Sequence, residues 1–162
     1  MVLSNAQWFA ASSVELDFTN MTTGAAASIA FDGVTVAAWN SSTQVQQNGA
    51  PPGAYTYYIG KDWGSGKTKL VATWKAYGTS DLGLLGAGGT ITVKSKLQGS
   101  DDDISYADLG SEDSETDTGG IILTQTSGLG TTAYRYHRLI FRHERSGETP
   151  TNIGVVEVEF TF

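Results

Sequence analysis

The chain has 162 residues, of which 20 are Gly, 17 are Asp or Glu, 10 are Lys or Arg, and none is Cys. Without Cys the chain forms no disulfide and no thiolate metal site, and its formal net charge of −7 excludes the basic field that nucleic-acid binders need. No apolar run approaches about 18 residues, so no transmembrane helix is expected, and residues 1–24 contain no readable signal peptide.

Short runs of β-branched and aromatic residues, separated by Gly, Ser, Asn and Asp, predict an all-β chain. Their spacing favours a single-domain antiparallel β-sandwich or jelly roll over residues 1–162, with 1–23 as an N-terminal segment packed on it or extending from it. A turn or two of helix is expected only within 5–11, and the longest loops at 43–53 and 99–119. The expected strands are 14–19, 26–31, 55–61, 68–76, 90–98, 120–126, 134–142 and 155–162.

Alternation along the last strand assigns its two faces. One face is expected in the core and carries Val156, Val158, Phe160 and Phe162. The other is expected toward solvent or a neighbouring loop and carries Glu157, Glu159 and Thr161. Strand 90–98 alternates in the same way, with Ile91, Val93, Ser95 and Leu97 on one face. Two further aromatic residues in strand patterns are expected in the core, Trp63 and Trp74.

Eight of the 17 acidic residues lie between Asp101 and Asp117, with no Lys or Arg among them. We expect this run to be a solvated loop, and weak cation binding is the open alternative.

Residues 64–68 read GSGKT, like the end of a phosphate-binding loop. The glycine that this motif requires would be at position 61, which is Lys61, and a strand rather than a helix follows, so a turn is predicted.

Catalytic patterns are absent from the sequence, and no enzymatic activity is expected. There is no Gly-x-Ser-x-Gly elbow and no Cys nucleophile. His137 and His143 lie about 20 Å apart if both are on one strand, too far to share a metal. His137 shares its face with Leu139 and Phe141, which favours a core position, with ligand contact as the alternative.

Several segments, taken together and in order, resemble discoidin domains, also called coagulation-factor type C domains, which share the galactose-binding-like fold. They are AFDGVTVAAWN (30–40), YIGKDWG (58–64), KAYGTSD (75–81), LQGSD (97–101), AYRYHRL (133–139) and IGVVEVEF (153–160). The resemblance runs from about residue 24 to the C-terminus, and its wording is most similar to versions found in phage structural proteins. It implies an eight-stranded antiparallel sandwich.

The resemblance also implies a structural Ca²⁺ site. Its ligands would be the Ala30 carbonyl, Asp32, Thr35 and Glu157, and such oxygen-only ligation suits calcium. Val34 departs from the family, which usually has Asn or Asp there. Under the alternative reading, Asp32 caps the turn and Glu157 accepts hydrogen bonds from nearby loop amides.

The family mostly binds ligands with loops at one end of the sandwich. Carried over, a sugar platform would comprise Trp39, Asn40, Tyr57 and Tyr58, with Arg138 as a further ligand contact. Aromatic faces stack on sugars while amides bond their hydroxyls. Core packing of Trp39, and a bridge from Arg138 to a loop carboxylate, are the competing interpretations.

Because these motifs are most similar to those of phage structural proteins, a virion role is the first functional hypothesis. The chain would be a capsid-decoration or tail-associated protein, assembled in the host cytoplasm and oligomeric in the particle, with other virion proteins as partners. A carbohydrate-binding module for host attachment is the alternative.

Three leucines among the glycines of 82–89 predict an exposed apolar loop through which a partner docks, made of Leu82, Leu84 and Leu85. The competing interpretation is that the leucines plug the end of the sandwich.

Overall fold

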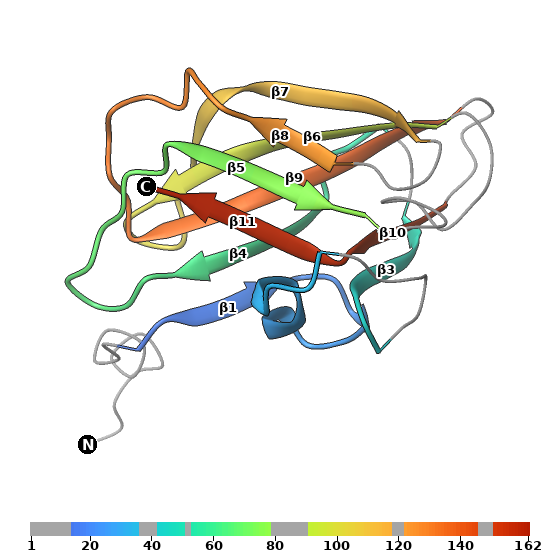
Figure 1. Ribbon diagram of the computed structural model, residues 1–162, viewed down its shortest axis with the longest axis horizontal. Helices are drawn as coiled ribbons and strands as arrows, with labels where there is room; N and C mark the ends of the chain where they lie inside the picture. The colour runs from blue at the N-terminus through green and yellow to red at the C-terminus, as the bar shows by residue number, and fades with distance from the viewer. Residues whose placement is uncertain (1–13, 36–41, 51–52, 79–90, 118–121, 146–150) are drawn as a thin grey trace.

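The computed structural model describes residues 14–35, 42–50, 53–78, 91–117, 122–145 and 151–162. Over these ranges the chain forms short antiparallel strands joined by turns, with one 3-10 helix, η1 (Figure 1). The strands and the helix are β1 (Leu16–Thr19), β2 (Thr23–Gly24), η1 (Ala27–Phe31), β3 (Val45–Ala50), β4 (Tyr57–Asp62), β5 (Thr73–Tyr77), β6 (Ile91–Ser100), β7 (Ala107–Asp117), β8 (Ile122–Gln125), β9 (Tyr136–Arg145), β10 (Thr151–Val155) and β11 (Glu157–Thr161).

The strands form three sheets in the described ranges, and every pairing between them is antiparallel. The largest sheet has the order β1-β4-β9-β6-β7. A second sheet, β11-β5-β8, lies across it as the other layer of the sandwich, and β10-β3-β2 closes one end (Figure 1). The fold is therefore the antiparallel jelly-roll sandwich that the sequence predicts.

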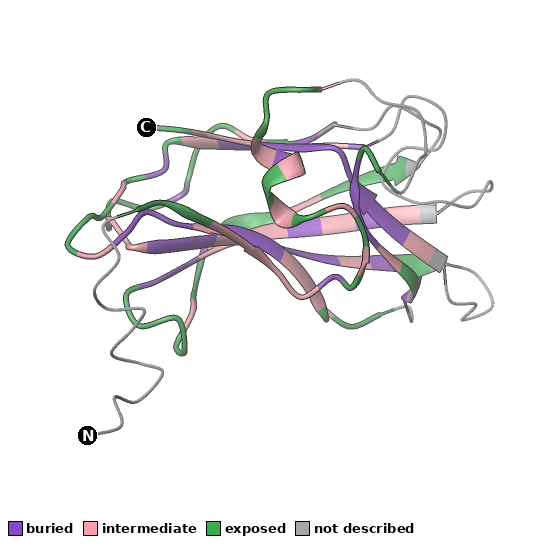
Figure 2. Cartoon of the chain, turned by 90° about the horizontal axis from the view of Figure 1, so that it is seen from below, coloured by how far each residue is buried: buried purple, intermediate pink, exposed green. Residues whose placement is uncertain are grey.

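Period-two alternation separates the core from the outer face of the large sheet. On β9 the side chains of His137, Leu139 and Phe141 are fully buried, while Arg138 and Arg142 on the opposite face remain partly exposed. This arrangement confirms the core position expected for His137. Burial is continuous through the middle of the sandwich and falls toward the turns (Figure 2). Each fully buried large apolar side chain contributes about 1.5–3 kcal/mol to folding.

Other expectations about the core are confirmed as well. Trp74 is completely buried and Trp63 is 5% exposed. On β6 the inward positions Val93 and Leu97 have no exposed surface. The GSGKT segment is a turn closed by a hydrogen bond from the Lys67 amide to the Gly64 carbonyl (3.1 Å), and extended chain follows it.

Three predicted elements are wrong. In place of the strand predicted at 26–31, residues 27–31 form η1, with the Ile29 amide donating to the Ala26 carbonyl (3.0 Å). The predicted loop 43–53 contains β3, and the predicted loop 99–119 contains β7. Acidic residues disfavour strands in general, but β7 is an edge strand whose carboxylates pair with lysines of β6. The short helix predicted within 5–11 lies outside the described residues. In the described ranges, no helix is long and apolar enough to cross a membrane.

The closing strand follows its predicted faces only in part. Val156 and Val158 are buried, and Phe160 is half-buried against Phe31 and Trp63. Phe162 lies beyond the end of β11 and is 59% exposed, so its predicted core position is wrong.

The opposite face of this strand meets a neighbouring turn, which is one of the two surroundings expected for it. Glu157 is only 4% exposed because it faces the turn that follows η1. Glu159 is half-buried and accepts a hydrogen bond from the Tyr77 hydroxyl (3.0 Å).

The contrast between two phenylalanines tests the assignment of the core. Phe141→Ala should lower the free energy of unfolding by about 3–5 kcal/mol, because it empties a fully buried site. Phe162→Ala should cost under about 1 kcal/mol, because most of its ring already contacts water. Urea denaturation of both variants measures the difference, and equal losses would contradict the assignment.

Candidate functional site

A row of four residues crosses the outer face of the large sheet. Strand register places Gly60 opposite Arg138, Arg138 opposite Gln98, and Gln98 opposite Asp108. Gly60 is required here, since a Cβ would lie 2.4 Å from the carbonyl oxygen of His137 and 2.7 Å from the Phe18 ring. The row therefore begins at a position without a side chain and continues as three polar groups.

Hydrogen bonds join these polar groups across β9, β6 and β7. Arg138 Nε donates to Gln98 Oε1 (2.9 Å), and Gln98 Nε2 donates to Asp108 Oδ1 (2.7 Å). Lys96 forms an ion pair with the other oxygen of Asp108. Burial alone would raise the pKa of Asp108, but the hydrogen bonds from Lys96 and Gln98 lower it below its usual range. The carboxylate is thus held ionised and in place.

Two tyrosines flank the guanidinium of Arg138. Its central carbon lies 3.5 Å from the ring centroid of Tyr106 and 4.7 Å from that of Tyr58. The Tyr106 hydroxyl donates to Asp103 Oδ1 (2.5 Å), and burial together with this bond raises the pKa of Tyr106. Stacking of this kind fixes the plane of the guanidinium.

A cleft of about 400 Å³ opens beside this row on the outer face of the sheet. Its size falls within the range of about 300–1,000 Å³ that is usual for small-ligand sites. Its lining combines aromatic and polar side chains, which is a composition suited to a hydroxylated ligand with one apolar face. The lining residues are Tyr55, Thr56, Tyr58, Lys96, Gln98, Asp108, Arg138 and Ile140.

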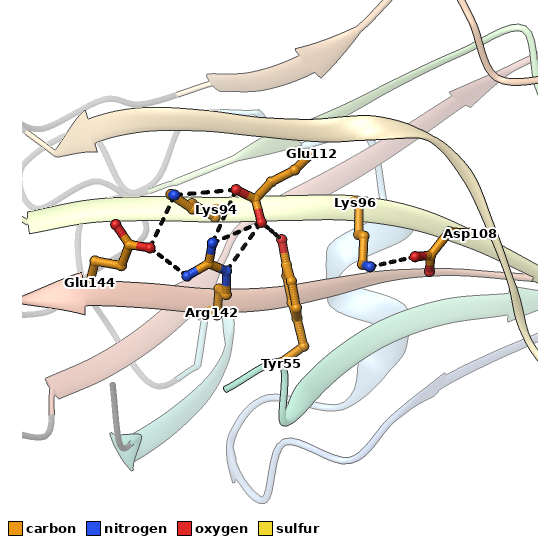
Figure 3. A network of polar contacts seen from close by, with 7 residues as sticks. All are labelled: Tyr55, Lys94, Lys96, Asp108, Glu112, Arg142 and Glu144. Carbon is orange, nitrogen blue, oxygen red and sulfur yellow. Dashed lines mark hydrogen bonds and ion pairs between the residues drawn. The ribbon is translucent and has the colours of Figure 1, made fainter. Parts of the chain in front are cut away.

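A charged network borders the cleft (Figure 3). Glu112 pairs with Lys94 (3.3 Å) and Arg142 (3.0 Å), and it accepts a hydrogen bond from Tyr55. Glu144 pairs with the same two cations, at 3.0 Å and 2.5 Å. Burial would raise the pKa of Glu112, but hydrogen bonds from Tyr55, Arg142 and Lys94 lower it. The charges of these side chains are therefore satisfied within the protein.

The structure brings together two of the five residues predicted to bind ligand, Tyr58 and Arg138. Both lie on strands of the sheet instead of on end loops. Tyr57 points to the other side of β4 and packs against the core, so it does not line the cleft. The competing bridge from Arg138 to a carboxylate is not formed among the described residues, where Gln98 is its hydrogen-bond partner.

Several predicted site residues lie outside the described residues. They are Trp39 and Asn40 of the sugar platform and Leu82, Leu84 and Leu85 of the predicted docking loop. Other residues of the cleft were not predicted at all. They are Tyr55, Thr56, Lys96, Gln98, Asp108 and Ile140. The alternation on β6 signals that Lys96 and Gln98 share a face, but only strand pairing shows that this face meets Arg138.

The predicted calcium ligands partly converge on the turn after η1. Glu157 Oε2 accepts a hydrogen bond from the Gly33 amide (3.0 Å), and Asp32 Oδ1 accepts one from the Val34 amide (2.9 Å). These are the bonds expected under the alternative reading. Burial, together with the nearby charge of Asp32, raises the pKa of Glu157 to about 7, although the hydrogen bond from the Gly33 amide opposes this shift.

The donor set at this turn fits calcium. A buried carboxylate that faces a second carboxylate is the environment that a divalent cation would relieve. Among the described residues no group of three or more His, Asp or Glu side chains could hold a metal. Calcium would therefore also need backbone oxygen, which the buried Ala30 could supply, together with the half-buried Thr35.

Solved structures to which this chain is similar include carbohydrate-binding modules. One is the CBM32 of AlyQ in complex with 4,5-unsaturated mannuronic acid, with 20% identity, a TM-score of 0.58, and coverage of 90% of this chain and 93% of that chain. Another is a CBM32 from Clostridium perfringens in complex with GalNAc-beta-1,3-galactose, with 17% identity, a TM-score of 0.59, and coverage of 91% and 95%. A chitosan-binding module from Paenibacillus sp. IK-5, in complex with chitotriose, has 18% identity and a TM-score of 0.52, with coverage of 91% and 96%.

These similarities establish the galactose-binding-like sandwich fold of this chain. No protein-family profile matches the chain, and no curated protein matches it. At identities of 20% or less, the shared fold carries no site residue from one protein to another.

His137 provides a test of the interior electrostatics. Burial lowers its pKa to about 4, against about 6.5 in an unfolded chain, and its Nδ1 accepts a hydrogen bond from Trp63 Nε1 (2.8 Å). The folded state thus binds fewer protons between these values, so the stability contributed by neutral His137 is lost as pH falls from about 6.5 to 4. NMR titration should show a neutral His137 ring at pH 5, and a midpoint near 6.5 would contradict its burial.

Proposed function

We propose that this chain is a non-catalytic glycan-binding module that holds sugar in the cleft on the outer face of the large sheet. The observation that carries the proposal is the arrangement of Tyr58 beside the Arg138–Gln98–Asp108 row. An aromatic face and a row of fixed donors and acceptors meet there in one cleft. The carbohydrate-binding modules that share the fold support the same class of ligand.

The chemistry of the cleft suits a sugar in two respects. A pyranose has an apolar face of C–H groups that packs against an aromatic ring, which Tyr58 and Tyr55 supply at the cleft wall. Its hydroxyls need both donors and acceptors, which Gln98, Asp108 and Arg138 supply. Because these groups sit on paired strands and bond one another, little ordering is required on binding.

We also propose that the turn after η1 holds a structural Ca²⁺. Asp32, Glu157, the Ala30 carbonyl and Thr35 would be its ligands. Bound there, the ion would supply the positive charge that the buried Glu157 lacks, and it would fix the turn against β11. This role concerns stability, since the turn contributes no residue to the cleft.

The virion role remains a prediction that rests on the phage-like wording of the sequence. Assembly into a particle, oligomerisation and docking through Leu82, Leu84 and Leu85 remain predictions with it. Glycan binding is the better supported proposal, because both the fold relatives and the cleft point to it. The two are compatible if the module attaches a particle to surface glycans.

Removing the aromatic wall tests the glycan proposal. On a glycan array, the protein should bind at least one oligosaccharide, and Tyr58→Ala should weaken that binding roughly 10-fold or more, since stacking on the ring is lost. Phe162→Ala is the matched control, because it removes an exposed aromatic ring that does not line the cleft. Circular dichroism confirms folding of both variants. An array with no binding, or equal losses in both variants, would overturn the proposal.

Calcium dependence of the melting temperature tests the metal proposal. At a calcium concentration about 100 times Kd, wild type should melt roughly 5–10 °C higher than in EDTA. Asp32→Asn should abolish that difference, because Asn keeps an oxygen for the Val34 amide but removes the charge. Identical melting curves in calcium and in EDTA for wild type would remove calcium from this account.

A further inference from the structure

Arg138 differs from the other cations on its face of the sheet. Lys94, Lys96 and Arg142 each pair with a carboxylate at the cleft or beside it. Arg138 pairs with no carboxylate in the part of the chain that the structure describes, and only its Nε is hydrogen-bonded, to Gln98. A positive charge in the cleft wall therefore has no counterion among the described residues.

The guanidinium is nevertheless held in place. The Gln98 bond fixes its Nε edge, and the rings of Tyr106 and Tyr58 lie within 3.5 Å and 4.7 Å of its central carbon. Its two terminal nitrogens have no hydrogen-bond partner among the described residues. A planar fork of this kind matches the two oxygens of a carboxylate, and binding costs little ordering because the side chain is already fixed.

The charge of the cleft contrasts with that of the chain. The whole chain carries a formal net charge of −7, yet the charged side chains that line the cleft are Lys96, Arg138 and Asp108, which leave one positive charge. Asp108 is already neutralised by Lys96. One anionic group of a ligand can therefore bind beside Arg138. A second anionic group would be repelled by the carboxylate of Asp103, which accepts a hydrogen bond from the Tyr106 hydroxyl, or by that of Asp108.

We propose that the cleft selects a glycan that carries a single carboxylate, such as a terminal uronic or sialic acid, and that Arg138 binds this carboxylate. The inference rests on the proposed glycan-binding function and names its ligand class. Polyanions with closely spaced charges are disfavoured by the acidic groups on either side. Tyr58 would stack on the sugar ring while Arg138 reads its charge.

A paired glycan array tests this selectivity. Oligosaccharides with one terminal uronic acid, and others with one sialic acid, are each printed beside their own methyl ester. Wild type should bind the free acids roughly 10- to 100-fold more tightly than the esters, because esterification removes the charge and retains the sugar. Comparison of binding to the uronic-acid oligosaccharides with binding to the sialic-acid oligosaccharides identifies which acid is the ligand. The preference should weaken as NaCl is raised.

Variants of Arg138 assign the preference to this side chain. Arg138→Gln should remove the difference between acid and ester, and Arg138→Lys should retain part of it. Lys75→Gln is the control, since it removes the same charge from β5, in the other sheet, and should leave the preference intact.

The outcomes separate the inference from the function on which it rests. If wild type binds acids and esters equally, or if Arg138→Gln keeps the preference, the inference is overturned while glycan binding stands. If wild type binds no printed glycan, the proposed function fails, and the inference fails with it.

Discussion

Period-two alternation along β9 is the constraint on which both the core and the candidate site depend. One face of this strand contributes Leu139 and Phe141 to the interior, and the other carries Arg138 to the cleft. Because β4 and β6 flank β9 in fixed register, Tyr58 and Gln98 are brought to the same outer face. A shift of one residue in either pairing would exchange core and cleft.

The site is therefore built on paired strands of the large sheet. Its polar groups bond across three strands, and the bordering charges of Glu112 and Arg142 neutralise one another (Figure 3). Among the described cations of the cleft wall, Arg138 is the one that pairs with no carboxylate, and its terminal nitrogens have no hydrogen-bond partner there. The charges beside the cleft are paired with one another, whereas Arg138 is not paired with a described carboxylate. The cleft should therefore prefer an anionic ligand, a preference that the shared fold alone does not specify.

Sequence reasoning predicts the sandwich, the buried tryptophans and the alternation of β6 and β9, because each depends on local period-two patterns. It fails at β7, where acidic residues suggest a loop and the compensating lysines lie on another strand. It leaves open whether Glu157 meets solvent or a neighbouring loop, because the burial of Glu157 depends on a turn more than 100 residues earlier in the chain. Of the site, Tyr58 and Arg138 are predicted. Asp108 joins them only through strand pairing, and Tyr106 only through its place in the chain just before β7.

The central claim is that ligand binds on the outer face of the sheet. NMR titration with an oligosaccharide that the array identifies tests it most directly, through chemical-shift changes of backbone amides and of the Gln98 side-chain amide. The account predicts the largest changes on β4, β9 and β6, around Tyr58, Arg138 and Gln98. Changes confined to the loops at one end of the sandwich, with the outer face unaffected, would contradict it.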